Sequence, residues 1–198
     1  RDVLAKQDNL YTLAILDKNI SYQVIGAIKE VLVASEQTND VITRMSAAST
    51  KLITLTITEK GYCLAADGSL DLNHSDIKHD LANPSAPVSA IGFIVEALKL
   101  RKLNSINAFN ILSCDNVSGN GDKLRRAVLD YAEQFDADLK DWIDTNVAFP
   151  NAMVDSITPK TENYTVESVS KAVGLQDNWP IQREEFTQWV IENNWQGE

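Results

Sequence analysis

Phe109-Asn110-Ile111-Leu112-Ser113-Cys114-Asp115-Asn116 is the stretch from which the fold can be inferred, because an apolar run ends there in a cluster of polar residues. A short apolar run bounded by turn residues is typical of a buried strand. Gly119 and Gly121 follow, and from Leu124 to Phe135 apolar residues recur at offsets of three and four, which predicts an amphipathic helix. In open α/β sheets ligands bind beyond the carboxyl ends of the strands. We therefore expect the last three residues of the stretch to stand at the rim of a site.

A second strand is predicted over residues 51–58, where apolar residues alternate with threonines. This period of two is the pattern of a half-buried strand. The strand runs directly into Glu59-Lys60-Gly61-Tyr62, so a second polar cluster follows the carboxyl end of a second strand. The two rims could meet in one cleft.

The remaining segments alternate between strand and helix patterns. The sequence predicts a hairpin over residues 10–16 and 22–28 and helices over residues 39–49, 89–102, 139–144 and 164–174. Residues 67–87 are polar, with two prolines and both histidines, and are interpreted as a long surface loop with about one helical turn. Residues 147–155 are largely apolar, but Pro150 would not suit a central strand. Strands that alternate with helices predict an α/β fold with a parallel sheet.

Composition narrows the class of protein. The 198 residues, 44% apolar and 23% charged, suit one ordinary globular domain. A net charge of −10 argues against binding to nucleic acid, which depends on Lys and Arg. Cys63 and Cys114 are too few for a disulfide scaffold, and no apolar run reaches the ~20 residues that span a bilayer. We expect a cytoplasmic protein without a membrane partner, and the start of the chain reads like a helix already under way, as in a fragment.

Two further motifs carry little weight. Gly119-Asn120-Gly121 supplies only the first half of a G-x-G-x-x-G dinucleotide fingerprint, so a simple turn is the interpretation. The polar loop holds residues that could in principle ligate a metal, but no pair follows the compact helical His spacing of familiar sites. These residues are Asp71, His74, Asp76, His79 and Asp80. A solvated loop explains them, and no metal is expected.

Three segments resemble one known family. They are Thr58-Glu59-Lys60-Gly61-Tyr62-Cys63, Ser113-Cys114-Asp115-Asn116 and Phe149-Pro150-Asn151-Ala152-Met153-Val154-Asp155. In this order they resemble the polyol-specific long-chain dehydrogenases, the mannitol dehydrogenase family, and residues 8–13, 79–84 and 188–192 extend the match over nearly the whole chain. Ser156 departs from the pattern, since the family usually has Arg there, so any cofactor or salt-bridge role of that Arg is absent or transferred.

The resemblance implies a Rossmann-type α/β domain of which residues 1–198 are the later part. Family members begin with a Gly-rich turn that binds the dinucleotide pyrophosphate, and this segment would lie before Arg1. They end with a helical domain that supplies a catalytic lysine, and this domain would lie after Glu198. The missing C-terminal domain of the same polypeptide is therefore an expected partner, and residues 1–198 alone are expected to be inactive.

The resemblance also implies site residues. Asn116 matches the asparagine that hydrogen-bonds the reacting oxygen, Glu59 a carboxylate beside the lysine base, and Asp155 an aspartate near nicotinamide and substrate. Thr58, Asn116, Val154 and Asp155 are the expected cofactor contacts. The alternatives are a helix-capping amide for Asn116, a surface carboxylate for Glu59 and a turn-forming residue for Asp155. Lys60 is interpreted as a solvated lysine, because the family base lies in the missing domain.

The implied activity is hydride transfer between NAD or NADP and a polyol or sugar acid, without a metal. Mannitol to fructose is favoured, on the strength of residues 149–152. Fructuronate (mannonate) reduction is the alternative within the family, since residues 58–63 suit it equally well. A non-catalytic remnant that serves as a binding or structural module is the alternative from another class.

Overall fold

The computed structural model describes residues 2–196. The helices and strands are α1 (Asp2–Ala5), β1 (Tyr11–Leu16), β2 (Ser21–Ile25), α2 (Thr38–Ser46), β3 (Leu52–Leu55), η1 (Glu59–Tyr62), α3 (Ser75–Ala82), α4 (Ala90–Leu103), β4 (Asn110–Ser113), α5 (Asn120–Glu133), α6 (Ala137–Asn146), β5 (Ala152–Asp155), α7 (Asn163–Val173), β6 (Ile181–Glu184) and β7 (Gln188–Ile191). They belong to two compact units. Unit 1 comprises the described residues up to Leu32 together with Asp155–Gln188, and unit 2 comprises Val33–Val154 and the described residues from Trp189 onward.

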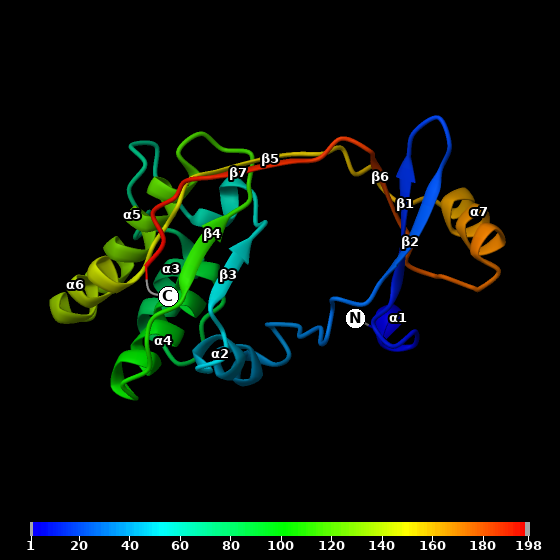
Figure 1. Cartoon of the computed structure of the whole chain (residues 1–198). Coiled ribbons are helices and arrows are strands. Elements are labelled where there is room, and N and C mark those ends of the chain that lie inside the picture. Colours follow the sequence, from blue (N-terminus) through cyan, green and yellow to red (C-terminus); the bar gives the residue numbers. More distant parts are fainter. Residues whose placement is uncertain (1, 197–198) are drawn as a thin grey trace. The chain divides into compact units, whose positions relative to one another are not determined.

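Unit 1 is built on a three-stranded sheet of order β2-β1-β6. Strands β1 and β2 are antiparallel, with Tyr11 opposite Ile25, and this confirms the predicted hairpin. Strand β6 runs parallel to β1. Helix α7, orange in Figure 1, contacts β6 through the Thr165 hydroxyl, which donates to Gln182, and it ends at Gly174, whose φ of 72° is left-handed as its sequence position predicts.

Asp177 holds the segments of unit 1 together. Its buried carboxylate accepts hydrogen bonds from the backbone N–H of Thr12 (2.6 Å) and of Trp179 (2.8 Å) and from the Gln7 amide (2.9 Å). Burial acts to raise the pKa of Asp177, but the hydrogen bonds from Gln7, Trp179 and Thr12 outweigh it and lower the pKa. Because the folded pKa lies below the unfolded one, this stabilisation is present at neutral pH and is lost as the pH falls through the folded pKa.

Unit 2 surrounds the parallel pair β3 and β4, in which Leu52 faces Asn110 and Leu55 faces Ser113. Helix α4 is buried along most of its length and packs against α2, α3, α5 and α6, beside the strands as Figure 1 shows. The Ser89 hydroxyl caps α4 by accepting from the backbone N–H of Gly92 (3.0 Å). The core contains the fully buried side chains Ile77, Ile91, Ile94, Leu98, Phe109, Ile111, Leu124, Val128 and Ile143.

Two predictions about local structure in unit 2 were wrong. The polar loop predicted over residues 67–87 contains the two-turn helix α3, which the sequence hides because only Ile77 of its turns is a fully buried apolar residue. The strand predicted over residues 51–58 ends at Leu55. It stops there because the N–H groups of Ile57 and Thr58 donate to the Asp115 carboxylate and not to a neighbouring strand.

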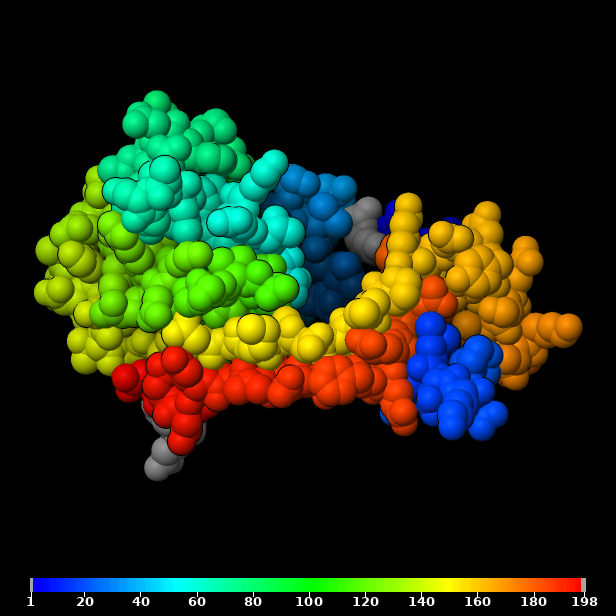
Figure 2. Space-filling model, turned by 90° about the horizontal axis from the view of Figure 1, so that it is seen from above, coloured from blue at the N-terminus to red at the C-terminus, as the bar shows by residue number. Residues whose placement is uncertain are grey.

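Strands β5 and β7 form a two-stranded sheet, and Figure 2 shows the chain around β5 (yellow) beside the chain around β7 (red). Strand β5 begins two residues after Pro150, so the proline lies outside the ladder as its missing N–H requires. Within unit 2, Asn151 and Glu192 are joined by two hydrogen bonds: Asn151 N–H donates to the Glu192 carboxylate, and Glu192 N–H donates to the Asn151 carbonyl. No described helix has the length and apolar character needed to cross a membrane.

Arg101 is a buried cation on α4 that joins two loops of unit 2, the one after α2 and the one after α4. Its guanidinium, on a residue only 1% exposed, donates to the carbonyls of Asn107 (2.6 Å), Thr50 (2.5 Å) and Ala47. It also lies 4.8 Å from the centre of the Phe109 ring. Burial lowers the pKa of Arg101, and no carboxylate among the described residues pairs with it. The planar guanidinium has several N–H donors at fixed angles, so one side chain can form hydrogen bonds with all three carbonyls.

We predict that Arg101→Met lowers the free energy of unfolding by about 3 kcal/mol, because three backbone carbonyls lose the buried donor that pairs with them. Arg101→Lys should recover only part of this, since a lysine cannot reproduce the fork. Urea unfolding monitored by circular dichroism measures the change. The control is Arg125→Met, which removes a half-exposed ion pair with Asp144 and should cost less than ~1 kcal/mol. Equal losses for Arg101→Met and Arg125→Met would contradict the assignment.

Candidate active site

The carboxyl ends of β3 and β4 lie at one edge of unit 2. Leu55 and Ser113 are the last paired residues of the two strands, and the Cys114 N–H donates to the Leu55 carbonyl (2.8 Å) just beyond them. The loop that follows each strand therefore leaves from the same edge. The two polar clusters predicted from the sequence meet there, at the edge where ligands bind in open α/β sheets.

The Asp115 carboxylate joins these two loops. Oδ2 accepts from the N–H of Ile57 (3.1 Å) and from the Tyr62 hydroxyl (2.6 Å), and Oδ1 accepts from the N–H of Thr58 (3.0 Å). Hydrogen bonds to a charged acceptor are about twice as strong as neutral ones. The loop after β4 thus determines the path of the loop after β3.

Tyr62 extends this network into the core. It is 3% exposed, and its oxygen lies 2.5 Å from the Ser113 hydroxyl. Because the Tyr62 proton is donated to Asp115, the Ser113 hydroxyl is the donor to Tyr62. Burial, followed by the hydrogen bond to Asp115, raises the pKa of Tyr62, so it stays a neutral donor across the physiological range.

Thr58 adopts a backbone conformation that is almost restricted to glycine. Its φ of 65° and ψ of 166° are exceptional for a β-branched residue and cost about 1–3 kcal/mol. The conformation turns the chain from the end of β3 into η1, whose first residue is Glu59. The hydrogen bond from Thr58 N–H to Asp115 helps to hold it. Strain of this kind is concentrated at functional sites.

The structure brings three of the predicted site residues to this edge: Thr58, Glu59 and Asn116. All three are exposed, and their side chains have no hydrogen-bond partner within residues 2–196. Asn116 does not cap α5, whose N-cap is Gly119, so the alternative role of Asn116 as a helix-capping amide is excluded. Val154 and Asp155 end β5, where the boundary between the two units falls, and their place at the site stays a prediction.

Asn120 is a site residue that the sequence did not reveal. It is 2% exposed, and its amide nitrogen donates to the carbonyls of Ala152 (2.8 Å), Asp115 (3.0 Å) and Ser113 (3.2 Å). Its oxygen accepts from the Ala152 N–H (2.9 Å). Asn120 thus joins the end of β4 to the start of β5. Its position between two glycines looks like an ordinary turn, so spacing carries no signal of this role.

The flanking glycines serve the turn and the packing of α5. Gly119 has a φ of 63°, and a Cβ on Gly121 would lie 2.4 Å from the Phe149 carbonyl oxygen. The N–H groups of Gly121 and Asp122 donate to the Asn151 side chain (2.8 and 3.2 Å). Since the first turn of α5 is capped from within the protein, it is not open to a phosphate. The interpretation as a simple turn is confirmed.

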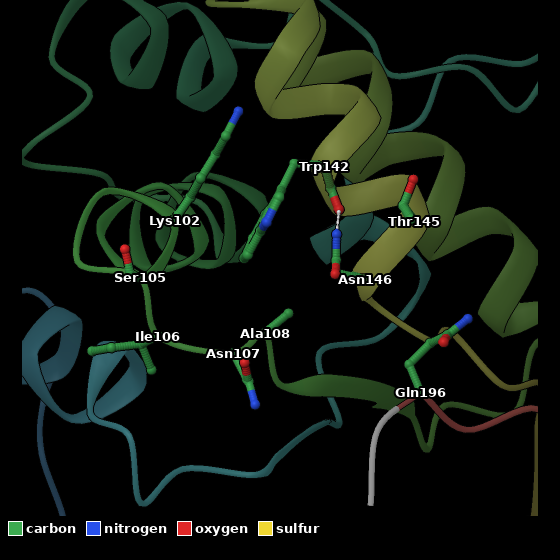
Figure 3. A pocket seen from close by; sticks show the side chains of 9 residues that line it. All are labelled: Lys102, Ser105, Ile106, Asn107, Ala108, Trp142, Thr145, Asn146 and Gln196. Atoms are coloured by element: carbon green, nitrogen blue, oxygen red, sulfur yellow. Dashed lines mark hydrogen bonds between the residues drawn. The ribbon is translucent and has the colours of Figure 1, made fainter.

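Two of the hollows formed by the described residues of unit 2 are large enough for a small ligand. One, of about 410 Å³, lies before the amino end of β4, and Figure 3 shows Trp142 and Lys102 on its wall. The other, of about 500 Å³, is lined by Glu59, Lys60 and Cys63. Only the second adjoins the carboxyl edge, so it is the hollow that belongs to the candidate site.

The described residues contain no group of three or more His, Cys, Asp or Glu side chains arranged to hold a metal. His74 Nδ1 accepts from the Asp76 N–H, and His79 pairs with Asp80. Asp80 is fully buried and accepts from the N–H groups of Val88 and Ser89. His74, His79 and Asp80, which the sequence placed in a loop, therefore stabilise α3 and the start of α4.

Comparisons with known proteins agree along the whole chain. The family described as mannitol dehydrogenase Rossmann domain matches residues 1–198. The chain is 45% identical to D-mannonate oxidoreductase of Escherichia coli K12, covering 96% of this chain and 40% of that protein. It is 40% identical to mannitol 2-dehydrogenase of Cereibacter sphaeroides, covering 98% of this chain and 41% of that protein.

Solved structures show the same fold. The chain superimposes on Pseudomonas fluorescens mannitol 2-dehydrogenase, in its ternary complex with NAD and D-mannitol, with a TM-score of 0.94 and 40% identity. It superimposes on substrate-free D-sorbitol dehydrogenase with a TM-score of 0.95 and 35% identity. Each comparison covers 100% of this chain and 41% of the other. The chain thus spans about two fifths of the length of its relatives, and the Rossmann-type α/β fold predicted from the sequence is confirmed.

We predict that Asp115→Ala lowers the free energy of unfolding by about 3 kcal/mol and speeds amide exchange at Ile57 and Thr58, because both N–H groups lose a charged acceptor. Hydrogen exchange measured by mass spectrometry on peptides covering residues 56–62 reports the local effect. The control is Asp141→Ala, an exposed carboxylate on α6. If exchange over residues 56–62 is the same in both variants, Asp115 does not hold the loop.

Proposed function

Because the chain belongs to the mannitol dehydrogenase family, we propose that the complete protein transfers hydride between a nicotinamide dinucleotide and a polyol or sugar acid. The observation that carries this proposal is the shared carboxyl edge of β3 and β4, where the loops bearing Glu59 and Asn116 are joined through Asp115. The relatives named as mannonate and mannitol oxidoreductases support the substrate class. Mannitol and fructuronate (mannonate) remain the two candidates, and the proposal includes a cytoplasmic location and no metal.

NAD is the proposed cofactor, since a solved relative was captured with NAD and D-mannitol. The residues at the edge suit a nicotinamide, because the Thr58 hydroxyl and the Asn116 amide are exposed and have no partner within the described chain. Together with Val154 and Asp155 they would hold the reactive end of the cofactor. When bound, NAD supplies the acceptor for the hydride that leaves the alcohol carbon.

Asn116 is proposed to stabilise the reacting oxygen. As hydride leaves an alcohol carbon, its oxygen passes through an alkoxide-like state, and an amide N–H aimed at it lowers the barrier. The free side chain of Asn116 at the strand edge is suited to this task because no internal hydrogen bond must be broken first. Asp155 is proposed to orient polar groups of the substrate or of the nicotinamide.

Glu59 is proposed to relay the alcohol proton to water. The family resemblance places a lysine base in the domain that follows this chain, and a carboxylate beside it can accept the proton and tune the base. Glu59 is exposed to solvent, as a relay to water requires. Glu59 extends from a fixed point, because Thr58 is strained and because the Asp115 carboxylate binds the N–H groups of Ile57 and Thr58 and the Tyr62 hydroxyl. We call these three hydrogen bonds the Asp115 clamp.

We predict that Asn116→Ala in the complete protein lowers kcat about 100- to 1,000-fold, equivalent to about 2.7–4 kcal/mol, and weakens NAD binding far less. Steady-state kinetics and fluorescence titration with NADH separate the two effects. The matched control is Asn73→Ala, an exposed asparagine outside the edge, which should keep the wild-type turnover. An unchanged kcat in a folded Asn116→Ala protein would remove this residue from the site.

We predict that Glu59→Gln changes the pH profile of alcohol oxidation, because the substitution keeps the size of the side chain and removes its titration. The rate should be measured from acid to alkaline pH in the complete protein. Glu167→Gln, an exposed position on α7, serves as the control. Superimposable profiles for wild type and Glu59→Gln would show that no proton passes through Glu59.

A further inference from the structure

We propose that the hollow beside Glu59 is an anion subsite that binds the carboxylate of a sugar acid and so sets the preference for an acid over a neutral polyol. This inference rests on the proposed function and specifies its substrate. The hollow has a volume of about 500 Å³, within the ~300–1,000 Å³ typical of small-molecule sites. It is lined by Glu59, Lys60, Cys63, Leu64, Ala65, Ala66, Gly68, His74 and Lys123.

The cations of the hollow lack internal partners. Lys123, in the first turn of α5, is only partly exposed, yet within residues 2–196 its ammonium group makes neither an ion pair nor a hydrogen bond, and the same holds for the ammonium group of Lys60. Three lysines on other helices of unit 2 are paired, Lys99 with Glu96, Lys102 with Asp138 and Lys140 with Glu133, whereas the exposed Lys78 of α3 makes no ion pair among the described residues. The chain has 28 acidic and 18 basic residues, so acidic partners are abundant. Two unpaired cations on one concave wall thus leave room for an anion from outside.

The other groups near the wall do not cancel these charges. Glu59 is the single carboxylate among the lining residues. Asp71, Asp76 and Asp80 lie close enough to act on Cys63, but they do not line the hollow. Each accepts a hydrogen bond from its own neighbourhood: Asp71 from the Asn73 N–H, Asp76 from the Ser75 hydroxyl and Asp80 from the Ser89 hydroxyl.

Two further lining residues, Cys63 and His74, are compatible with an anion. Burial, with help from nearby carboxylates, raises the pKa of Cys63 to about 11, so its thiol carries no negative charge. His74 Nδ1 accepts from the Asp76 N–H at 3.3 Å. With Nδ1 as an acceptor, the N–H of the ring lies at Nε2, which remains available as a donor.

The position of the hollow connects it to the chemistry. Glu59 and Lys60 are consecutive residues of η1, so the proposed proton relay and the first cation belong to one short segment. A short-chain sugar acid could place its carboxylate against Lys60 and Lys123 while a carbon further along faces the strand edge. A lysine forms charge-assisted hydrogen bonds with a carboxylate, and these strengthen binding. With an uncharged terminal hydroxymethyl group it forms only weaker, neutral-acceptor hydrogen bonds. The subsite would therefore discriminate between an acid and the corresponding polyol.

The test uses the complete protein with D-mannonate and D-mannitol, which differ at one terminal carbon. We expect Lys60→Ala and Lys123→Met each to lower the ratio of kcat/KM for mannonate to that for mannitol about 10-fold, chiefly through KM for mannonate. Methionine keeps the apolar stem of Lys123 and removes the charge. Lys123→Arg should keep most of the wild-type ratio, and Lys78→Met, an exposed position on α3, should keep all of it.

Three results would overturn the inference. If both lysine variants keep the wild-type ratio of kcat/KM for mannonate to that for mannitol, the hollow does not bind the carboxylate. A rise in KM for NAD that matches the rise for mannonate would assign the cations to the cofactor phosphates. If the wild-type protein oxidises neither compound, the proposed function fails, and the subsite is then tested separately by calorimetric titration with D-mannonate. Binding that is abolished by Lys123→Met would support the subsite. No binding, or equal binding by wild type and variant, would reject it.

Discussion

The hydrogen bonds from the N–H groups of Ile57 and Thr58 to the Asp115 carboxylate are the constraint on which the candidate site depends. Without an acceptor at this point, the chain after β3 would have no reason to leave the ladder at Leu55 or to hold Thr58 at a φ of 65°. The same carboxylate receives the Tyr62 hydroxyl, so η1 is held at both ends. One side chain beyond β4 thus fixes the loop that carries Glu59. The side chain of the neighbouring residue, Asn116, has no hydrogen-bond partner within residues 2–196.

A second constraint places Asp115 itself. The buried amide of Asn120 holds the Asp115 carbonyl and the end of β4 while it pairs with both backbone groups of Ala152. Helix α5 can bring Asn120 there only because Gly121 permits its first turn to approach the Phe149 carbonyl. The glycine therefore serves packing between helix and chain, although in sequence it resembles part of a phosphate motif. The site therefore has two parts. Its rigid base is the hydrogen-bonded set of Asp115, Asn120 and Tyr62, and its exposed edge consists of the strained Thr58 with Glu59 and Asn116.

The sequence predicted the elements whose burial is periodic and failed where polar groups hold the backbone. Helices α2, α4, α5, α6 and α7, the β1–β2 hairpin and the parallel arrangement of β3 and β4 follow from apolar spacing. Helix α3 was missed because its stability comes from a capping His74 and from the buried Asp80, which look like loop residues. The strain at Thr58 and the role of Asn120 also escaped, because both depend on partners more than 30 residues away. Glu59 and Asn116 were predicted as site residues by resemblance, and spacing alone would not have distinguished them from surface residues.

The division between rigid base and exposed edge also bears on specificity. The groups that hold the site together, Asp115, Asn120 and Tyr62, are satisfied by internal hydrogen bonds, so they have little capacity left for a ligand. The groups around the adjoining hollow differ, since Lys60 and Lys123 have no internal partner in the described chain. Substitution of a lysine there would leave the clamp intact, whereas any change to Asp115 would move Glu59 as well. The lysines of the hollow could therefore be exchanged without rebuilding the edge at which hydride transfer is proposed to occur.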